Sequence, residues 1–485
     1  MRTKKLNNLF DGIKANLPLE SIVINVSGIE YDSRKIKKGD LFAAVPGFNT
    51  DGHNYLEMAA KSGAVCAVVE KMNKNLKLPQ VIVKNSRLAM AKIAADFYSP
   101  EAESLTLCGI TGTNGKTTTS YLVRSIMEEA GLACGIIGTI SYSFGGKEVP
   151  AWNTTPEAPD IAKILYEAAG QGQKACVLEV SSHALSLNRV DGLKFDAAVF
   201  TNISRDHLDF HKTEENYYKA KRKLFSLLKP DGTAVINLDN RFGRRLIKEI
   251  NRPVLTFGHS KEAAVRVIDE NVSITGTRLA VQTKKGEIQI ASKLTGGYNI
   301  ENISAAVAAG LAMNIHPEHI AAGINKLERV PGRLETYPIT GNRMAVIDYA
   351  HTPDALEKAL QSLRELTSGR LVVVFGAGGG RDKGKRPLMG SIAEKYGDKI
   401  IVTSDNPRNE DPDEIIKDIT EGMSMPEKYE VIADRRAAIM QTIQNSENGD
   451  VILISGKGHE TYQEVQGRKY EFNELEIVKE AAEHV

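Results

Sequence analysis

The chain is poor in the features that mark secreted, disulfide-bonded and nucleic-acid-binding proteins. Its 485 residues include only four cysteines, with no C-x-x-C pair: Cys66, Cys108, Cys134 and Cys176. Each lies in an apolar run, which favours buried thiols in a reducing compartment over disulfides or a zinc site. The 62 Lys and Arg residues nearly balance the 61 Asp and Glu residues, so the net charge is only +1. No global field therefore attracts nucleic acid or an anionic membrane.

Long apolar segments are also missing. The longest apolar runs, such as Leu371–Phe375, are far shorter than the roughly 20 residues of a membrane span. The start, MRTKKLNNLF, is basic, but the apolar segment of a signal peptide does not follow it. Hydrophobic content of 42% and charged content of 25% are typical of soluble globular chains. We therefore expect a cytoplasmic protein of two to four domains, each with its own core.

The clearest motif is the glycine-rich segment Gly109–Thr119, GITGTNGKTTT. Ser104–Cys108 before it predicts a strand, and the apolar spacing of Ser120–Ala130 after it predicts a helix. A strand, a glycine turn, Lys-Thr and a helix form a cradle for phosphates, in which the lysine neutralises charge and the first threonine can hold Mg²⁺. The match to G-x-x-x-x-G-K-[ST] is imperfect, because Ile110 occupies the first glycine position, and a plain glycine turn is the alternative. We interpret the segment as a nucleoside triphosphate site.

The remaining patterns predict an α/β protein of three domains. Short strands, one of them expected at 22–26, mix with helices up to residue 98, and the segment 98–104 reads as a linker. A further strand is expected at 136–143, and the segment 329–333 marks the second domain boundary. Alternating residues in 272–294 predict an antiparallel excursion from a parallel sheet. After residue 333, strands and helices alternate as in a doubly wound sheet. We predict a small mixed α/β N-terminal domain (1–100), a central P-loop domain (101–331) and a Rossmann-like C-terminal domain (332–485).

Several polar residues follow predicted strands, where function concentrates in such sheets. Glu179 ends the predicted strand 174–180, the usual place for a metal-binding acid in a P-loop sheet. His207 and His211 are four residues apart and could form a zinc pair, but neither a third ligand nor H-E-x-x-H accompanies them. We favour a His207 that meets Mg²⁺ or its water shell.

Two further loops have a structural and a functional interpretation. Asp32-Ser33-Arg34 is typical of an Asx turn, but Ser33 and its neighbouring N–H groups could also bind a pyrophosphate. The segment GAGGGR at 376–381 is a poor dinucleotide fingerprint, because Arg381 stands where the last glycine belongs. This mismatch disfavours a nicotinamide cofactor.

Twelve motifs in order make the chain resemble the Mur ligase family over essentially its whole length. They are YDSRKIKKGDLFAAVPG, GITGTNGKTTT, NTTPE, EVSSHAL, SRDHLDFH, YYKAKRKLF, the pair YN at 298, PGRLE, DYAHTPDAL, GGGRDKGKRP, SDNPRNEDP and SGKGHE. The resemblance implies a ligase that adds a diamino acid to UDP-N-acetylmuramoyl-L-alanyl-D-glutamate while ATP becomes ADP and phosphate. It also implies a soluble, monomeric enzyme of cell-wall precursor synthesis without nucleic-acid or membrane partners.

The resemblance also implies roles for individual positions. ATP is expected to contact Thr111, Gly112, Thr113, Asn114, Gly115, Lys116, Thr117, Asn299 and Arg333. The UDP substrate is expected to contact Ser33, Asn153, Thr154, Thr155, Ser181 and Arg189, whereas Leu187 stands where some members have a glutamine contact. Magnesium is expected at Thr117, Glu179, His207 and Lys221, with Lys221 present as a carbamate formed with CO₂. The expected catalytic residues are Lys116, Glu179, His207 and Lys221. The incoming amino acid is expected at Arg381, Asp405, Asn406, Pro407, Arg408, Gly456 and Glu460.

Two expectations can be checked directly against a structure. The basic neighbours Lys219, Arg222 and Lys223 should favour the neutral Lys221 amine that reacts with CO₂. An arginine fork at Arg408 should select meso-diaminopimelate over lysine, because lysine would leave the fork facing no anion, at a cost of roughly 3–5 kcal/mol.

Three other functions stay open at this point. One is a lysine-adding ligase of the same family. Folate polyglutamate ligases share the P-loop and carbamate features but do not explain NTTPE, SGKGHE and DNPR. The third is a nucleotide-regulated binding protein that has lost catalysis, against which the intact Lys116, Glu179, His207 and Lys221 argue.

Overall fold

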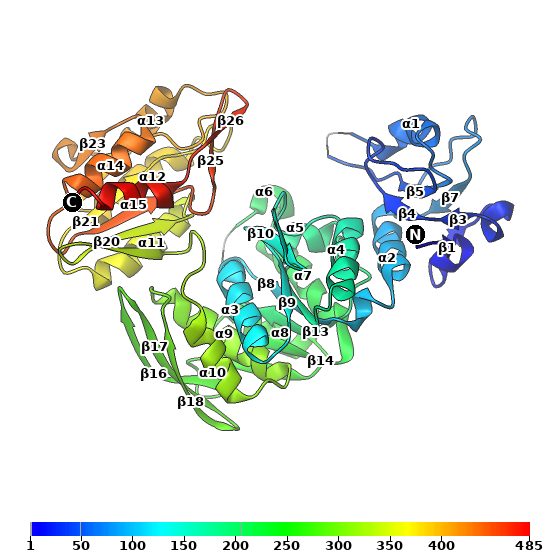
Figure 1. Cartoon of the computed structure of the whole chain (residues 1–485), viewed down its shortest axis with the longest axis horizontal. Coiled ribbons are helices and arrows are strands. Elements are labelled where there is room, and N and C mark those ends of the chain that lie inside the picture. The colour runs from blue at the N-terminus through cyan, green and yellow to red at the C-terminus, as the bar shows by residue number, and fades with distance from the viewer. Residues whose placement is uncertain (1, 49, 205) are drawn as a thin grey trace. The chain divides into compact units, whose positions relative to one another are not determined.

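The computed structural model describes residues 2–48, 50–204 and 206–485, and its main sheets are drawn in Figure 1. Arg205 of the SRDHLDFH motif therefore lies outside the described residues. Two compact units emerge from the packing, Met1–Arg266 with Ser304–Gly323, and Val267–Ile303 with Ile324–Val485. Among the described residues, no helix combines the length and the apolarity that crossing a membrane requires.

The N-terminal part of the first unit is a small sheet covered by helices. Its strands have the order β2-β7-β6-β5-β4, parallel except for the β2–β7 pair. Its elements are β1 (Lys4–Lys5), η1 (Asn7–Phe10), β2 (Ala15–Asn16), η2 (Leu19–Ile22), β3 (Asn25–Val26), β4 (Gly28–Glu30), β5 (Asp40–Ala43), η3 (Gly52–Tyr55), α1 (Leu56–Lys61), β6 (Cys66–Val69), β7 (Gln80–Val83), α2 (Ser86–Tyr98) and η4 (Ala102–Ser104).

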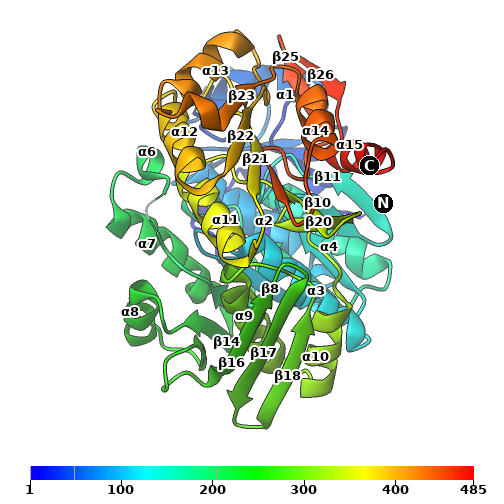
Figure 2. The same ribbon diagram turned by 90° about the vertical axis from the view of Figure 1, so that its left-hand side faces the viewer.

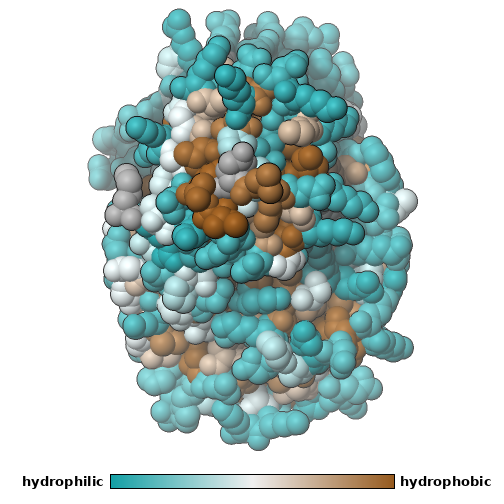
Figure 3. Space-filling model, turned by 90° about the vertical axis from the view of Figure 1, so that its right-hand side faces the viewer, coloured by the Kyte–Doolittle hydropathy of each residue, from teal (hydrophilic) through white to brown (hydrophobic). Residues whose placement is uncertain are grey.

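Large apolar side chains remain exposed in this N-terminal part. Leu19, Ile22, Val23 and Phe48 are among them, and Leu19 is 95% exposed. On the face seen in Figure 3, apolar side chains gather in the upper half. The strand expected near residues 22–26 is accordingly reduced to β3, because the apolar residues before it do not enter the core.

The central domain is built on a mainly parallel sheet. The strands β9, β12, β8, β13, β14 and β15 lie side by side in this order and are parallel, and β10 and β11 extend the β9 edge in antiparallel fashion. Its elements are β8 (Thr106–Thr111), α3 (Lys116–Glu129), β9 (Cys134–Ile137), β10 (Ser141–Phe144), β11 (Lys147–Pro150), α4 (Ala158–Gly170), β12 (Ala175–Glu179), α5 (Ser182–Ser186), β13 (Phe195–Phe200), α6 (Leu208–His211), α7 (Glu214–Arg222), η5 (Lys223–Leu227), β14 (Leu228–Asn237), α8 (Arg241–Glu249), β15 (Val254–Gly258), β16 (Val265–Ser273), β17 (Gly276–Thr283), β18 (Gly286–Ser292), α9 (Tyr298–Ala312) and α10 (Pro317–Lys326).

The predicted single strand near residues 136–143 is two strands in the structure. The chain leaves β9 at Ile137 and returns as β10 from Ser141. A Cβ at Gly138 would lie 2.3 Å from Glu179 Oε1, so the turn passes close to this carboxylate. The glycine therefore lets the backbone reach Glu179, which the strand prediction did not foresee.

The C-terminal sheet has the order β19-β20-β24-β21-β22-β23, and only β19 runs antiparallel to its neighbour. Figure 2 shows α12 and α13 on one side of β21 and β22, and α14 and α15 on the other. Its elements are β19 (Glu335–Ile339), β20 (Arg343–Asp348), α11 (Pro353–Leu366), β21 (Leu371–Phe375), α12 (Lys385–Tyr396), β22 (Lys399–Val402), α13 (Pro412–Thr420), η6 (Pro426–Lys428), β23 (Tyr429–Val431), α14 (Arg435–Gln444), β24 (Val451–Ser455), β25 (Tyr462–Val465), β26 (Arg468–Glu471) and α15 (Glu474–Ala482).

The expected fold class is confirmed: the protein is a three-domain α/β protein with a mixed central sheet and a mostly parallel C-terminal sheet. Both faces of the C-terminal sheet are covered by buried apolar clusters, which explains the continuous apolar sequence of β21, LVVVF. The antiparallel excursion is also present, as the β17–β18 pair. The exact domain limits at residues 100 and 331 stay predictions.

Candidate functional site

The glycine-rich loop joins β8 to α3, as the motif predicts. The helix begins at Lys116, four residues before the predicted start, because Gly115 at its N-cap adopts a φ of +84°. The Lys116 ammonium donates to the carbonyl oxygens of Gly112 (3.0 Å) and Thr113 (2.9 Å). The loop thus curls around its own lysine at the N-terminus of α3, where phosphate oxygens bind favourably.

The end of β13 supports this loop, which the sequence did not indicate. Asn114 N–H donates to Asn202 Oδ1 at 3.0 Å, and Thr201 Oγ1 donates to the Asn114 carbonyl at 2.6 Å. A Cβ at Gly112 would lie only 1.8 Å from Thr201 Oγ1. The absence of a side chain at Gly112 therefore lets the loop pack closely against the residues that follow β13.

Glu179 lies beside the loop because β12 is the parallel neighbour of β8. Its buried carboxylate accepts from Thr117 Oγ1 at 2.9 Å and from Thr139 Oγ1 at 3.0 Å, and also from Thr139 N–H at 2.9 Å. A carboxylate with a threonine hydroxyl is the oxygen donor set that Mg²⁺ accepts in nucleotide sites. The structure therefore unites two predicted magnesium ligands and adds Thr139, which the sequence analysis missed.

Lys221 is a fully buried cation of α7. Its ammonium donates to the Gly112 carbonyl at 2.7 Å and lies 4.4 Å from the centre of the Tyr217 ring. Burial, followed by the charge of Lys116, holds the pKa of Lys221 well below its usual value. Burial next to the phosphate loop therefore favours the neutral amine more than an exposed position would.

The predicted cause of this pKa shift is wrong. Lys219 pairs with Glu215 at 3.7 Å, Arg222 with Glu249 at 2.8 Å and Lys223 with Asp191 at 2.7 Å. These three cations are neutralised by their own partners and are not among the causes of the lowered pKa of Lys221. A run of basic residues on a helix is usually a solvated face, but Lys221 is only 1% exposed.

His207 occupies a different position from the other predicted magnesium ligands. It is the N-cap of α6 with a φ of +52°, and its half-exposed ring lies 3.4 Å from Asp206. Burial lowers the pKa of His207, so the imidazole is kept neutral, as a metal ligand must be. Among the contacts of the described residues, none joins His207 to Glu179, so its metal role stays a prediction.

His211 is engaged elsewhere in the fold. Its Nε2 lies 3.0 Å from Ser182 Oγ, and burial lowers the pKa of His211 to about 4. Within the residues that the structure describes, no group of three or more His, Cys, Asp or Glu side chains is arranged to hold a metal ion.

Four of the predicted contacts to the UDP substrate come together around Glu179 in the central domain. Thr155 Oγ1 donates to the Glu179 carbonyl at 2.7 Å and accepts from Ser181 N–H at 3.1 Å. Thr154 Oγ1 lies 3.2 Å from Thr139 Oγ1. Arg189 donates to the Thr155 carbonyl at 2.9 Å, and Glu157 of the NTTPE motif holds its Nε at 2.9 Å. The four predicted UDP-substrate contacts and the glycine-rich loop thus lie at the same edge of the sheet.

Asn153 and Ser33 lie outside this hydrogen-bonded group. Asn153 N–H donates to Tyr142 Oη at 3.1 Å. Ser33 is buried in the N-terminal domain with its Oγ 3.3 Å from Met58 Sδ, and Asp32 forms the expected Asx turn by accepting from Arg34 N–H at 3.1 Å. The turn interpretation of this segment is confirmed, and the substrate contact of Ser33 stays a prediction.

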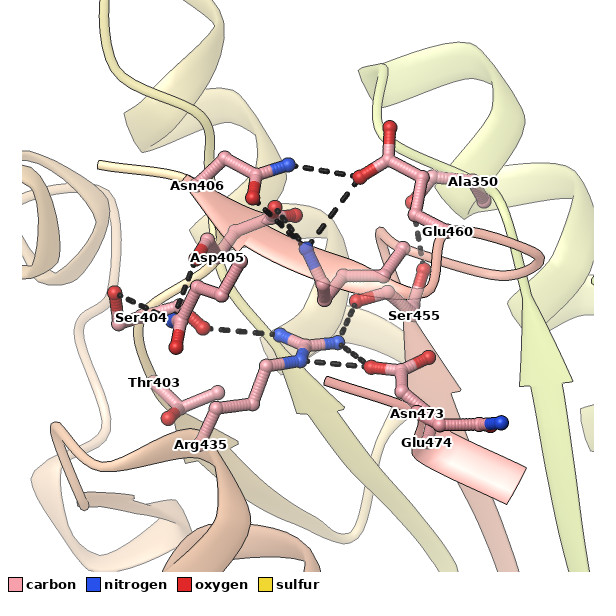
Figure 4. A network of polar contacts seen from close by, with 12 residues as sticks. Ala350, Thr403, Ser404, Asp405, Asn406, Arg435, Ser455, Glu460, Asn473 and Glu474 are labelled. Atoms are coloured by element: carbon pink, nitrogen blue, oxygen red, sulfur yellow. Dashed lines mark hydrogen bonds and ion pairs between the residues drawn. The ribbon is translucent and has the colours of Figure 1, made fainter. Parts of the chain in front are cut away.

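A second cluster forms in the C-terminal domain, where the ends of β24, β21 and β22 are neighbours (Figure 4). Asn406 Nδ2 donates to Glu460 Oε2 at 2.8 Å. A Cβ at Gly456, which has a φ of +125°, would lie 2.5 Å from Asp405 Oδ2. The structure thus brings together four predicted contacts of the incoming amino acid: Asp405, Asn406, Gly456 and Glu460.

Arg408 has partners within the protein. Its Nη1 donates to the Gly379 carbonyl at 2.6 Å, and its Nε lies 3.4 Å from Glu464 Oε2. Pro407 precedes it, and Arg408 itself adopts a φ of +53°. The expectation that bound lysine would leave this guanidinium facing no anion is therefore wrong, because Glu464 supplies a carboxylate. Arg381 is exposed and makes no hydrogen bond or ion pair with the cluster in the described part of the chain.

The predicted adenine and ribose contacts belong to the second unit. Asn299 is buried, and its Nδ2 donates to the Thr295 carbonyl at 2.6 Å. The Arg333 guanidinium lies 5.0 Å from the centre of the Tyr349 ring. The nucleotide roles of these two residues stay predictions.

Comparison with known proteins gives a consistent result along the chain. Residues 25–98 match the "Mur ligase family, catalytic domain", residues 110–310 the "Mur ligase middle domain" and residues 332–458 the "Mur ligase, glutamate ligase domain". The chain is 43% identical over 464 residues to UDP-N-acetylmuramoyl-L-alanyl-D-glutamate–2,6-diaminopimelate ligase of Aquifex aeolicus, covering 96% of this chain and 95% of the relative. The enzyme of the same name from Geobacter metallireducens is 42% identical, with 95% of each chain covered.

Solved structures agree with this similarity. A structure of a UDP-N-acetylmuramoyl-L-alanyl-D-glutamate–2,6-diaminopimelate ligase superimposes with a TM-score of 0.74 at 32% identity, covering 99% of both chains. Folylpolyglutamate synthase of Mycobacterium tuberculosis, complexed with ADP, shares the fold at 19% identity, with a TM-score of 0.61 over 76% of this chain and 91% of that one.

Proposed function

Because the chain belongs to the Mur ligase family, we propose that it adds meso-diaminopimelate to UDP-N-acetylmuramoyl-L-alanyl-D-glutamate, with ATP as the energy source. The product is the UDP-linked tripeptide of peptidoglycan precursor synthesis. The observation that carries the proposal is a set of hydrogen bonds at one edge of the sheet. They join the phosphate loop to Glu179, Glu179 to Thr155, and Thr155 to Ser181, and the last two residues are predicted contacts of the UDP substrate. We further propose a cytoplasmic enzyme that works as a monomer.

The chemistry requires an activated carboxylate, because a carboxylate ion does not react with an amine at neutral pH. The glutamate carboxylate oxygen attacks the γ-phosphorus of ATP, the bond to ADP breaks, and an acyl phosphate forms. The amine of diaminopimelate then attacks the acyl carbon, loses a proton and expels phosphate. Since the acyl phosphate is itself reactive, this chain's residues need only orient the reactants and stabilise charge.

Lys116 and Thr117 serve the nucleotide end of this reaction. The loop presents N–H groups and the Lys116 ammonium to phosphate oxygens, which offsets the repulsion between ATP and the carboxylate substrate. Glu179 and Thr117 fit Mg²⁺ by their oxygen donors, and His207 is a further candidate ligand. Bound Mg²⁺ supplies charge stabilisation on the transferring phosphoryl group.

Lys221 fits the role of a carbamylated lysine. Its buried amine has a lowered pKa, which leaves the nitrogen lone pair available to CO₂. The carbamate would turn a buried cation next to the loop into an anion able to hold a metal or order its water. This change also removes the repulsion between two neighbouring lysines, Lys221 and Lys116.

The cluster around Asn406 and Glu460 fits the zwitterionic end of the amino acid. Carboxylates at Asp405 and Glu460 attract an ammonium group, and the Arg408 guanidinium attracts a carboxylate. Lysine has the distal ammonium group but lacks the distal carboxylate, so the presence of Arg408 favours diaminopimelate. A catalytically silent nucleotide-binding protein would not need this second cluster.

An isotope experiment tests the proposed function. Substrate carrying ¹⁸O in the glutamate carboxylate should transfer one ¹⁸O into the released phosphate, because the acyl phosphate passes its bridging oxygen to the leaving group. Diaminopimelate and lysine are compared as acceptors in the same assay. Formation of AMP and pyrophosphate, or phosphate without ¹⁸O, would contradict the acyl phosphate route.

A further inference from the structure

Lys457, in the SGKGHE motif, is a completely buried lysine close to the amino-acid cluster. Its side chain is 0% exposed, and its ammonium lies 5.6 Å from the Tyr462 ring centre and 5.9 Å from the Phe472 ring centre. Burying a cation is costly unless it is paired and hydrogen-bonded. The groups that pair with the Lys457 ammonium therefore indicate the role of this buried lysine.

Those partners are side chains of the predicted amino-acid site. Lys457 Nζ donates to Asn406 Oδ1 at 2.9 Å, and it lies 3.4 Å from Glu460 Oε2 and 3.8 Å from Asp405 Oδ1. Figure 4 shows Asp405, Asn406 and Glu460 directed toward one another. One cation thus lies among two carboxylates and an amide from two different loops.

The ammonium is also one of two donors that orient Asn406. Asn406 Oδ1 accepts from Lys457 and from the Glu464 N–H at 2.8 Å, while its Nδ2 donates to Glu460. Turning the amide over would place its NH₂ group against two donors, which no hydrogen-bond arrangement satisfies. Lys457 and the Glu464 N–H together therefore keep the Asn406 donor directed at Glu460.

The charge balance has a similar consequence. Counted by formal charge, Asp405 and Glu460 contribute two negative charges and Lys457 one positive charge, which leaves a formal charge of −1 for these three side chains. Without the lysine, the Asp405 and Glu460 carboxylates would repel each other. This repulsion would favour a Glu460 side-chain conformation that points away from Asp405. With it, both carboxylates stay in place while one net negative charge is left for an ammonium group.

Arg435 provides a contrast within the same network. This buried arginine pairs with Glu474 at 2.7 Å and donates to the backbone carbonyls of Ser404 (3.2 Å) and Ser455 (2.9 Å). Arg435 thus contacts two backbone carbonyls and the buried Glu474, and such contacts are typical of a residue that stabilises the fold. The contacts of Lys457 are instead with side chains that are expected to touch the substrate.

We propose that Lys457 is a positioning residue, which holds Asn406 and Glu460 in the arrangement that binds the distal ammonium group of the incoming diamino acid. The inference rests on the proposed ligase function and adds a residue to its specificity machinery. Lys457 itself is too buried to touch the substrate, so it acts through these two side chains.

The substitution Lys457→Met tests this inference, because methionine keeps the apolar stem and removes the ammonium. The KM for diaminopimelate should rise at least tenfold, whereas the KM values for ATP and the UDP-dipeptide stay within twofold. Lys457→Gln, which keeps a neutral donor, should give an intermediate KM. The exposed lysine of α15 supplies the matched control Lys479→Met, which should leave all three KM values unchanged.

A double-substitution cycle separates positioning from general stability. If Lys457 acts through Glu460, Lys457→Met should add less than twofold to the KM of Glu460→Gln. Independent, multiplicative effects would overturn the proposal, as would an unchanged KM for diaminopimelate or an equal loss for all substrates. If both Lys457 variants fail to fold, by circular dichroism and thermal melting, Lys457 is a structural residue and the proposal is wrong. Absence of ligase activity in the wild-type protein would instead refute the proposed function, whatever the variants do.

Discussion

At the scale of single residues, Arg408 gives the sharpest expectation about substrate choice. Its guanidinium is held by the Gly379 carbonyl and by Glu464, which presets the direction of the side chain. A charged hydrogen bond to the distal carboxylate of diaminopimelate contributes about 1.5–3 kcal/mol. Arg408→Ala should therefore lower the ratio of kcat/KM for diaminopimelate over lysine by about tenfold or more, since 1.4 kcal/mol corresponds to tenfold.

The measurement is steady-state kcat/KM for both amino acids in the wild type and the variant. Arg468→Ala, on the exposed strand β26, is the matched control and should leave the ratio unchanged. A wild type that uses lysine as well as diaminopimelate would show the assignment to be wrong. So would a ratio that Arg408→Ala does not alter.

Lys221 carries the second residue-scale prediction. Its buried amine beside the phosphate loop should react with CO₂, so Lys221→Ala should lose nearly all ligase activity. Short carboxylic acids such as acetate or formate should restore part of it, because their anions can occupy the position of the carbamate. The partner substitution Lys219→Ala removes an exposed, paired lysine of the same helix and should retain activity. Wild-type turnover in Lys221→Ala would rule out the role.

At the scale of elements, the two ends of α3 differ in what their glycines do. Gly112 before the helix leaves no space for a Cβ against Thr201, whereas a Cβ at Gly131 after the helix would meet no heavy atom within 4 Å, at a φ of +79°. Gly112→Ala should therefore displace the loop and raise the KM for ATP at least about tenfold. Gly131→Ala should cost about 1 kcal/mol of stability through backbone strain and leave the KM for ATP unchanged.

ATP titrations and thermal melting separate these two outcomes. If Gly112→Ala binds ATP normally, the close packing of the loop on β13 is not required for nucleotide binding. A raised KM for ATP in Gly131→Ala would show that strain at the far end of the helix reaches the loop.

At the scale of the whole molecule, the phosphate loop belongs to one compact unit and the Asn406–Glu460 cluster to the other. A complete reaction needs both, because the acyl phosphate must meet the amine before water does. ADP release should therefore depend on both the UDP-dipeptide and diaminopimelate, with omission of either lowering the rate at least about tenfold. Steady-state ADP formation with each substrate left out measures this dependence. Equally fast ATP hydrolysis without the amino acid would indicate that the two halves of the reaction are not coupled.

The sequence alone determined which functional residues lie in the loops that follow the predicted strands. A P-loop is a local motif, and parallel neighbouring strands end at the same sheet edge, so Lys116, Thr117 and Glu179 could be expected to meet. The strand-and-helix alternation after residue 333 likewise predicted the loops that carry Asp405, Asn406 and Glu460. Such features depend on short segments and on general rules of sheet topology, which a sequence displays directly.

Only the tertiary structure decided which side chains are buried together. Lys221 reaches the Gly112 carbonyl across 109 residues, and Lys457 reaches Asn406 across 51. In sequence both lysines stand in polar surroundings, and neither the burial of Lys221 nor the partners of Lys457 could be deduced from neighbours along the chain. Burial and pairing depend on which distant elements pack against a residue, and that packing sets both the lowered pKa of Lys221 and the orientation of Asn406.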